Sequence, residues 1–128
     1  MPEPIDRLRA PHHIWGEVSD GWRLVDQPGL SVVEERVPAG AGEEWHVHAR
    51  ARQFFYVTEG EAVMRTAEGD VALAPGRGTE IPAGLPHQIF NQGPGDVRFL
   101  VISAPSTRGD RAAVAPPPPR GEGPTGTD

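Results

Sequence analysis

The sequence predicts an all-β protein, and three features of the 128-residue chain support this. β-Rich runs recur about every 8–12 residues, with glycine, proline and acidic turn signals between them. No segment shows a sustained helical repeat of about 3.6 residues. Glycine (16) and proline (15) are both abundant, as expected for short strands joined by many turns. Together these features favour a sandwich or a closed barrel.

The expected strands follow one another from residue 13 to residue 103. Most are rich in β-branched, aromatic or aliphatic residues, and most end at a glycine, proline or acidic turn. A turn is also expected at residues 19–21 (Ser-Asp-Gly), between the first two strands. The expected strands are residues 13–18, 22–25, 30–37, 45–48, 53–58, 62–66, 71–74, 79–81, 87–91 and 97–103.

The chain is predicted to hold one domain with two irregular ends. Residues 1–12 are polar and contain three prolines, which indicates an irregular N-terminal arm. Residues 13–108 are expected to form the β-barrel, a length typical of one small domain. Residues 109–128 carry glycine, proline and charge without a core-forming pattern. We therefore predict a disordered Pro/Gly-rich tail over residues 109–128.

The composition excludes several kinds of chemistry. Cysteine is absent, so the chain has no disulfide, no thiolate ligand and no cysteine nucleophile. All twelve basic residues are arginine, so no lysine can act in catalysis. The net charge of −6 argues against general affinity for nucleic acid or anionic membrane. No apolar run approaches the roughly 18 residues of a membrane span, and the N-terminus lacks the apolar core of a secretory signal, so a cytoplasmic protein is expected.

Two stretches carry the candidate site. Residues 40–60 (GAGEEWHVHARARQFFYVTEG) place His46 and His48 two residues apart on an expected strand, so both side chains leave the same face. Gln53 follows at the start of the next strand. Residues 76–91 (GRGTEIPAGLPHQIFN) contain His87. Neutral imidazole is the commonest protein ligand for first-row transition metals, so a barrel that brings these strands together could bind one metal ion.

These two stretches resemble the two signatures of the cupin family. The first signature is a glycine, five residues, His-x-His, three or four residues, a glutamate, six residues and a glycine. It is matched by Gly40, His46, His48 and Gly60, with Gln53 in the place of the glutamate. The second signature is a glycine, five residues, Pro-x-Gly, two residues, a histidine, three residues and an asparagine. It is matched by Gly76, Pro82, Gly84, His87 and Asn91.

The resemblance covers about residues 30–104 and implies a double-stranded β-helix, which is a small jelly-roll barrel. It also implies one divalent transition-metal ion (Fe, Mn, Ni, Zn or Co), held by the residues at the signature positions. These residues are His46, His48, Gln53 and His87. Many small cupins are homodimers, so the resemblance also implies a homodimer. We further expect a small-molecule ligand or substrate.

Gln53 departs from the family pattern in its charge. An amide oxygen places no negative charge on an ion, so the site is expected to be more positive, and to bind metal less tightly, than a site with glutamate. Direct ligation of the ion by Gln53 is one interpretation. The other is a hydrogen bond from Gln53 to a ligand water or an imidazole.

No catalytic residue is assigned, and other residues near the motifs are expected mostly at surface or packing positions. His12 and His13 are expected to be solvated in the arm. Glu43 and Glu44 are conceivable bases just before the ligand strand, but exposure to solvent is expected for both. By alternation with Gln53, Tyr56 should face outward. Core packing, rather than a substrate pocket, is expected for most of Trp45, Phe55, Val57, Met64, Ile89 and Phe99.

Three hypotheses of function follow. The first is a metal-dependent enzyme that acts on a small oxygenated molecule. An Fe(II) or Ni(II) centre could activate dioxygen, whereas a Zn(II) or Mn(II) centre could act as a Lewis acid in isomerisation, cyclisation or lyase chemistry. The second is a non-catalytic cupin that binds a metal or small ligand as a sensor or carrier. The third is a structural barrel with an empty site.

Overall fold

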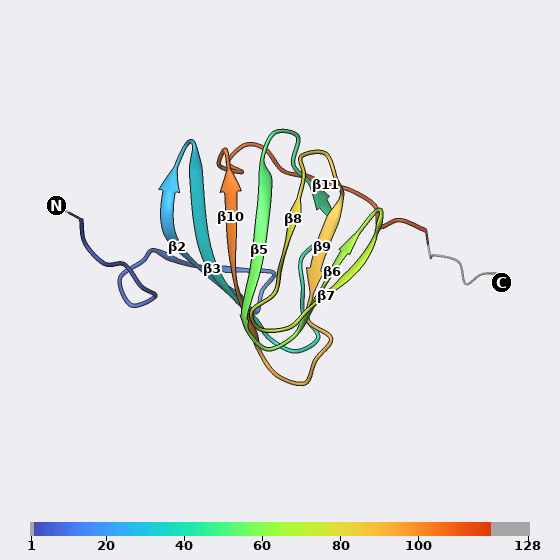
Figure 1. Cartoon of the computed structure of the whole chain (residues 1–128), viewed down its shortest axis with the longest axis horizontal. Coiled ribbons are helices and arrows are strands. Elements are labelled where there is room, and N and C mark those ends of the chain that lie inside the picture. Colours follow the sequence, from blue (N-terminus) through green and yellow to red (C-terminus); the bar gives the residue numbers. More distant parts are fainter. Residues whose placement is uncertain (1, 119–128) are drawn as a thin grey trace.

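The computed structural model of the protein describes residues 2–118, which form eleven strands in two antiparallel sheets (Figure 1). Residues 2–118 contain no helix that is long and apolar enough to cross a membrane. The strands are β1 (His12–Trp15), β2 (Ser19–Gln27), β3 (Leu30–Val37), β4 (His46–Val47), β5 (Arg52–Glu59), β6 (Ala62–Thr66), β7 (Gly69–Leu73), β8 (Gly78–Ile81), β9 (His87–Phe90), β10 (Val97–Ala104) and β11 (Ala112–Ala113).

The chain passes back and forth between the two sheets. One sheet has the strand order β1-β2-β3-β10-β5-β8, and the other has the order β11-β4-β9-β6-β7. From β3 onward, each new strand or hairpin joins the sheet opposite the one before it (Figure 1). This winding is the double-stranded β-helix, or jelly roll, and it confirms the predicted all-β fold class.

Period-two alternation on the central strands builds the core. On β5, Phe55 and Val57 are buried, and on the neighbouring β10, Phe99 is completely buried. Phe54 and Tyr56 alternate with them and are partly exposed on the outer face. Burying a side chain of this size contributes about 1.5–3 kcal/mol, so these positions hold the two sheets together. The predicted core residues Phe55, Val57, Met64, Ile89 and Phe99 all lie in this cluster.

The barrel interior changes character along the same strands. The buried position of β5 next to Phe55 is Gln53, and its partner on β10 is Ser103, which is also buried. One end of the barrel is therefore filled with apolar side chains, and the other end is polar. Polar atoms there need partners or a ligand, because an unpaired buried polar group is costly.

The first hairpin differs from its predicted form. The chain reverses at Gly16 and Glu17, which have positive φ angles of 59° and 73°. The turn expected at residues 19–21 is wrong, because these residues belong to β2 and pair with β1. Gly21 is a strand residue over which the ring of His13 lies, and a Cβ there would come within 2.5 Å of that ring. Gly21 is therefore a strand glycine that allows the close approach of the His13 ring, and it is not part of a turn.

The disordered tail predicted from residue 109 is wrong for its first part. Asp110 is buried, and β11 pairs with β4 on the five-stranded sheet. This segment is held by hydrogen bonds rather than by apolar side chains, so its hydrophobicity carries no sign of order. Residues 119–128 lie outside the described residues, and disorder there stays a prediction.

Candidate metal centre

Two histidines meet across the pairing of β4 with β9. His46 on β4 lies directly opposite His87 on β9, and their ring centroids are 4.4 Å apart. The two residues lie 41 positions apart in the chain, so only the folded sheet brings them together.

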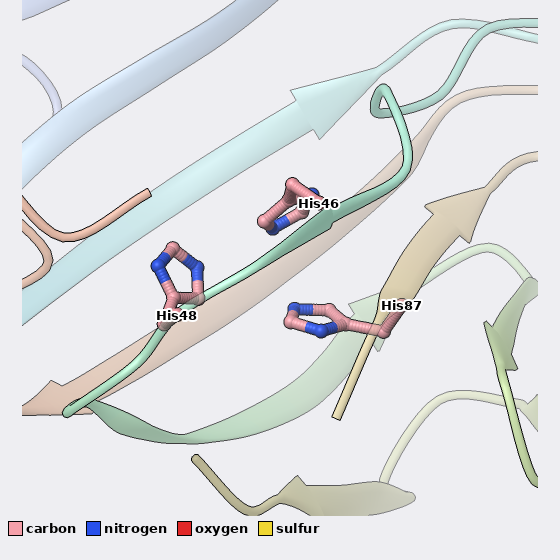
Figure 2. Close-up of side chains that lie close together, drawn as sticks. All are labelled: His46, His48 and His87. Carbon is pink, nitrogen blue, oxygen red and sulfur yellow. The ribbon is translucent and has the colours of Figure 1, made fainter. Parts of the chain in front are cut away.

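His48 completes the cluster from the end of β4. Its ring centroid lies 4.9 Å from that of His46 and 5.7 Å from that of His87. Figure 2 shows the three rings gathered about one region, two from the strand β4 and its end and one from β9. One nitrogen from each ring lies within 4.8 Å of the others, and all three residues are buried. The structure therefore brings together the three histidines that the sequence singled out.

The Nδ1 atom of every ring is bound to a backbone carbonyl oxygen. His46 donates to Glu44 at 2.7 Å, and His87 donates to Leu85 at 2.8 Å, each to the carbonyl two residues earlier. His48 donates to the carbonyl of Asp110 at 2.5 Å. Since a carbonyl only accepts, Nδ1 carries the proton in each case, and each neutral ring keeps its Nε2 lone pair for another partner.

Burial keeps the rings of His46 and His87 neutral. Removal from water lowers the pKa of His46 and of His87 to about 4, which outweighs the opposing effect of the backbone carbonyls. Both rings are thus unprotonated at neutral pH, the state required of a metal ligand.

Gln53 lies beside the three rings. Its Nε2 donates to Ser103 Oγ at 3.0 Å, and its Oε1 lies 3.0 Å from His87 Nε2. With Nδ1 protonated, His87 Nε2 and Gln53 Oε1 both present lone pairs to one another. The repulsion between these lone pairs is removed if a cation lies between them. It is also removed if the amide turns by 180° and its NH2 group donates to the ring. Metal–ligand bonds of about 2.1 Å place neighbouring ligands roughly 3.0 Å apart at a right angle, so the observed separation fits ligation by Gln53.

The residues present fit a divalent metal ion. His48 Nε2 is buried and has no hydrogen-bond partner among residues 2–118, as expected for an atom that awaits a ligand. One nitrogen of each ring lies within 4.8 Å of the others, so rotations of the rings would bring all three around one ion. The donor set has no carboxylate, so it adds no negative charge.

The segment after β10 supports the site, although no sequence pattern indicates this. The carboxylate of Asp110 accepts the backbone N–H groups of residues 49, 50 and 51, at 2.7, 3.0 and 2.9 Å. Burial alone would raise the pKa of Asp110, but these three donors lower it below its usual value. The N–H of Val114 also donates to Trp45 at 3.0 Å, beside the pairing of β11 with β4. We call residues 106–114 the C-terminal strap.

Three carboxyl groups line the cavity beside the rings of His46 and His48, and one of them, that of Asp26, is paired with Arg108. The cavity has a volume of about 300 Å³ and is lined by Glu35 and Glu43 as well as by His46, His48 and Gln53. The prediction that Glu43 is solvent-exposed is wrong: the residue is half-buried, and its carboxylate accepts the N–H of Ile89 at 3.0 Å. The same prediction is confirmed for Glu44.

The two arm histidines have different environments. His12 is exposed, as expected, and its Nε2 lies 2.8 Å from Asp20 Oδ1. His13 is half-buried and lines the cavity, so its predicted solvated position is wrong. Burial lowers the pKa of His13, with the charge of Arg23 acting in the same direction.

The family model for the cupin domain matches residues 33–103. The chain belongs to the cupin family, in agreement with the fold and with the histidine cluster. No curated protein matches the sequence.

Solved structures with the same fold carry several different names. A sugar phosphate isomerase of the cupin superfamily from Silicibacter pomeroyi is 23% identical, with a TM-score of 0.72, covering 81% of this chain and 76% of that one. The polyketide cyclase RemF from Streptomyces resistomycificus is 21% identical, with a TM-score of 0.72, covering 83% and 81%. A predicted oxalate decarboxylase from Thermotoga maritima is 22% identical, with a TM-score of 0.64, covering 69% and 81%. At these identities the likeness shows the fold.

Proposed function

We propose that this protein is a metal-dependent enzyme that rearranges a small oxygenated molecule by proton transfer, as isomerases and cyclases do. The structures similar to it carry the names of an isomerase, a cyclase and a decarboxylase, so the fold does not select one chemistry. The choice rests on the residues of the site.

The observation that carries the proposal is the convergence of three buried imidazoles, two of which line a cavity together with Glu35 and Glu43. Three nitrogen ligands leave coordination positions for a substrate oxygen, which is typical of reactive rather than structural metal sites. The carboxyl groups favour proton transfer over dioxygen activation, because proton transfer needs an acid or base beside the substrate and dioxygen activation does not.

Each group has a definite part in this proposal. A divalent ion held here would act as a Lewis acid on a substrate oxygen. His46, His48 and His87 would hold it through Nε2, since Nδ1 of each ring is bound to a carbonyl. Gln53, held by Ser103, adds a neutral oxygen and preserves the positive charge of the ion. Glu35 and Glu43 stand on the cavity wall and can exchange protons with a bound molecule.

Elemental analysis of protein purified without added ions tests the proposal. We expect about one equivalent of a divalent transition metal in the wild type, its loss in His46→Ala and His87→Ala, and its retention in the exposed control His12→Ala. Wild-type protein that neither carries nor takes up a metal ion would contradict the proposal.

Oxygen uptake with enols, catechols or thiols under iron or nickel loading would instead favour a dioxygenase. Metal binding without turnover of any of these substrates or of α-hydroxycarbonyls would favour a sensor or carrier. The expected homodimer and cytoplasmic location stay predictions.

A further inference from the structure

The two carboxyl groups of the barrel interior differ in how they are held. Glu43 precedes β4, and its carboxylate accepts a backbone N–H. Glu35 lies on β3, at an inward position that it shares with Ser31 and Val33, and it lines the same cavity. The carboxyl group of Glu35 makes no hydrogen bond and no ion pair with any residue of the part of the chain that the structure describes, so both of its oxygens are available to a ligand.

Glu35 also stands at the boundary of a second cavity. This cavity, of about 340 Å³, lies toward the first hairpin and is lined by Trp15 and Gly16. Four side chains line both cavities, namely His13, Glu35, Glu43 and Arg111. A molecule that extends from the imidazoles toward the first hairpin would therefore pass Glu35.

The surroundings of Glu35 favour its protonated form. Burial raises the pKa of Glu35 well above its ordinary value, the negative charge of Glu43 raises it further, and Arg111 opposes them. Burial also raises the pKa of Glu43, but the N–H of Ile89 counteracts this. The titratable and charged groups that line the two cavities with Glu35 are His13, Arg23, Asp26, Glu43, Glu44, His46, His48, Arg108 and Arg111.

A second, independent observation marks the same cavity as a ligand site. His48 lines it, is only 4% exposed, and has an Nε2 atom with no partner among residues 2–118. An unpartnered imidazole nitrogen and an unpartnered carboxyl group thus line one cavity. A ligand with an oxygen near the imidazoles and an exchangeable proton near Glu35 would satisfy both.

We propose that Glu35 is the catalytic acid and base of this pocket and that its substrate is an α-hydroxycarbonyl compound, which it converts between keto and enol forms. This inference rests on the proposed function. One oxygen of the neutral carboxyl group gives its proton to the substrate carbonyl oxygen, and the other takes a proton from the adjacent carbon. The electron pair of the broken C–H bond forms the new C=C bond. The π pair of the carbonyl group forms the O–H bond of the new hydroxyl group. Glu35 ends protonated as it began, so the step needs no co-reactant.

Glu43 acts through Glu35 and is a positioning residue. Its carboxylate is held in place by Ile89, and its charge opposes ionisation of the neighbouring carboxyl group. In Glu43→Gln this repulsion is absent, so Glu35 should lose its proton at a lower pH.

Deuterium exchange from D2O into hydroxyacetone and dihydroxyacetone, followed by NMR with zinc-loaded protein, tests the inference. We expect Glu35→Gln to slow exchange by about 10²-fold or more while zinc affinity stays within about threefold of the wild type. The matched control is Glu34→Gln, because Glu34 is the next residue on β3, faces outward and pairs with Arg7. The control should exchange at the wild-type rate. Exchange in Glu35→Gln within threefold of the wild type would overturn the inference.

Infrared spectroscopy provides a readout that does not depend on activity. At pH 7 the wild type should show the carbonyl band of a protonated carboxylic acid, absent in Glu35→Gln and present in Glu34→Gln. The midpoint of its titration should move to lower pH in Glu43→Gln. Absence of the band in the wild type, or its persistence in Glu35→Gln, overturns the inference. Protein that binds zinc but exchanges no proton also overturns it and leaves the metal site standing, whereas protein that binds no zinc contradicts the proposed function itself.

Discussion

The Nδ1 atom of His48 donates a hydrogen bond to the backbone carbonyl of Asp110, at 2.5 Å. The two residues lie 62 positions apart, and Asp110 follows the last strand of the six-stranded sheet. One of the three imidazoles is therefore oriented by the C-terminal strap and not by its own loop. His46 and His87, by contrast, bind the carbonyl two residues before them.

Asp110→Ala should weaken metal binding. The carboxylate holds three consecutive N–H groups of the loop after His48, so its removal frees both the loop and the carbonyl that orients the ring. Loss of such an outer partner typically lowers metal affinity about 10–100-fold, and we expect a loss in this range. Competition with a chromogenic zinc chelator measures it, with the exposed Asp70→Ala as control. Equal affinity of Asp110→Ala and the wild type would contradict this role of the strap.

Gln53→Glu should tighten metal binding. Gln53 Oε1 lies 3.0 Å from His87 Nε2, a separation suited to two ligands of one ion, and a carboxylate there would add a full negative charge beside the cation. We expect affinity for zinc to rise about tenfold or more by the same competition assay. Gln92→Glu, at an exposed position, adds the same charge far from direct coordination and should have little effect. Unchanged affinity in Gln53→Glu would place the amide outside the ligand set.

The metal-free protein should lose stability on acidification between about pH 6.5 and about 4. The pKa values of His46 and His87 are lowered from 6.5 to about 4 in the folded state, chiefly by burial. In this window the unfolded chain binds more protons than the folded one, so the free energy of unfolding decreases as the pH falls. Urea midpoints at pH 7, 5.5 and 4.5 measure the effect. The slope should flatten in the double variant His46→Gln/His87→Gln, and an equal slope in that variant would refute the assignment.

Phe99→Ala should destabilise the barrel by about 3–5 kcal/mol, the usual cost of removing a fully buried phenylalanine side chain. Phe99 is completely buried against Phe55, with ring centroids 6.0 Å apart. Phe54→Ala, on the outer face of β5 and 39% exposed, serves as the matched control and should cost much less. Chemical denaturation of both variants provides the measurement, and equal losses would contradict the assignment of the two faces.

Much of the fold and the histidine cluster could be predicted because local rules govern them. Alternation places Phe55 and Val57 inward on β5, and fixed spacing within the two motifs brings His46 opposite His87. Asp110 could not be predicted, because it acts through hydrogen bonds at long range in a segment without apolar pattern. The strand pattern does distinguish Glu35, because alternation along β3 places this charged residue at an inward position where an apolar residue is expected.

X-ray absorption spectroscopy of the zinc-loaded protein tests the central claim most directly. The account predicts three imidazole nitrogens at about 2.0–2.1 Å, with the outer-shell scattering that imidazole rings produce, and one or more oxygen ligands. A decrease of that imidazole scattering in a His48→Ala sample would show that the ring held by the strap is one of the ligands. A zinc spectrum with only oxygen neighbours, or one unchanged by replacing any of the three histidines, would contradict the account.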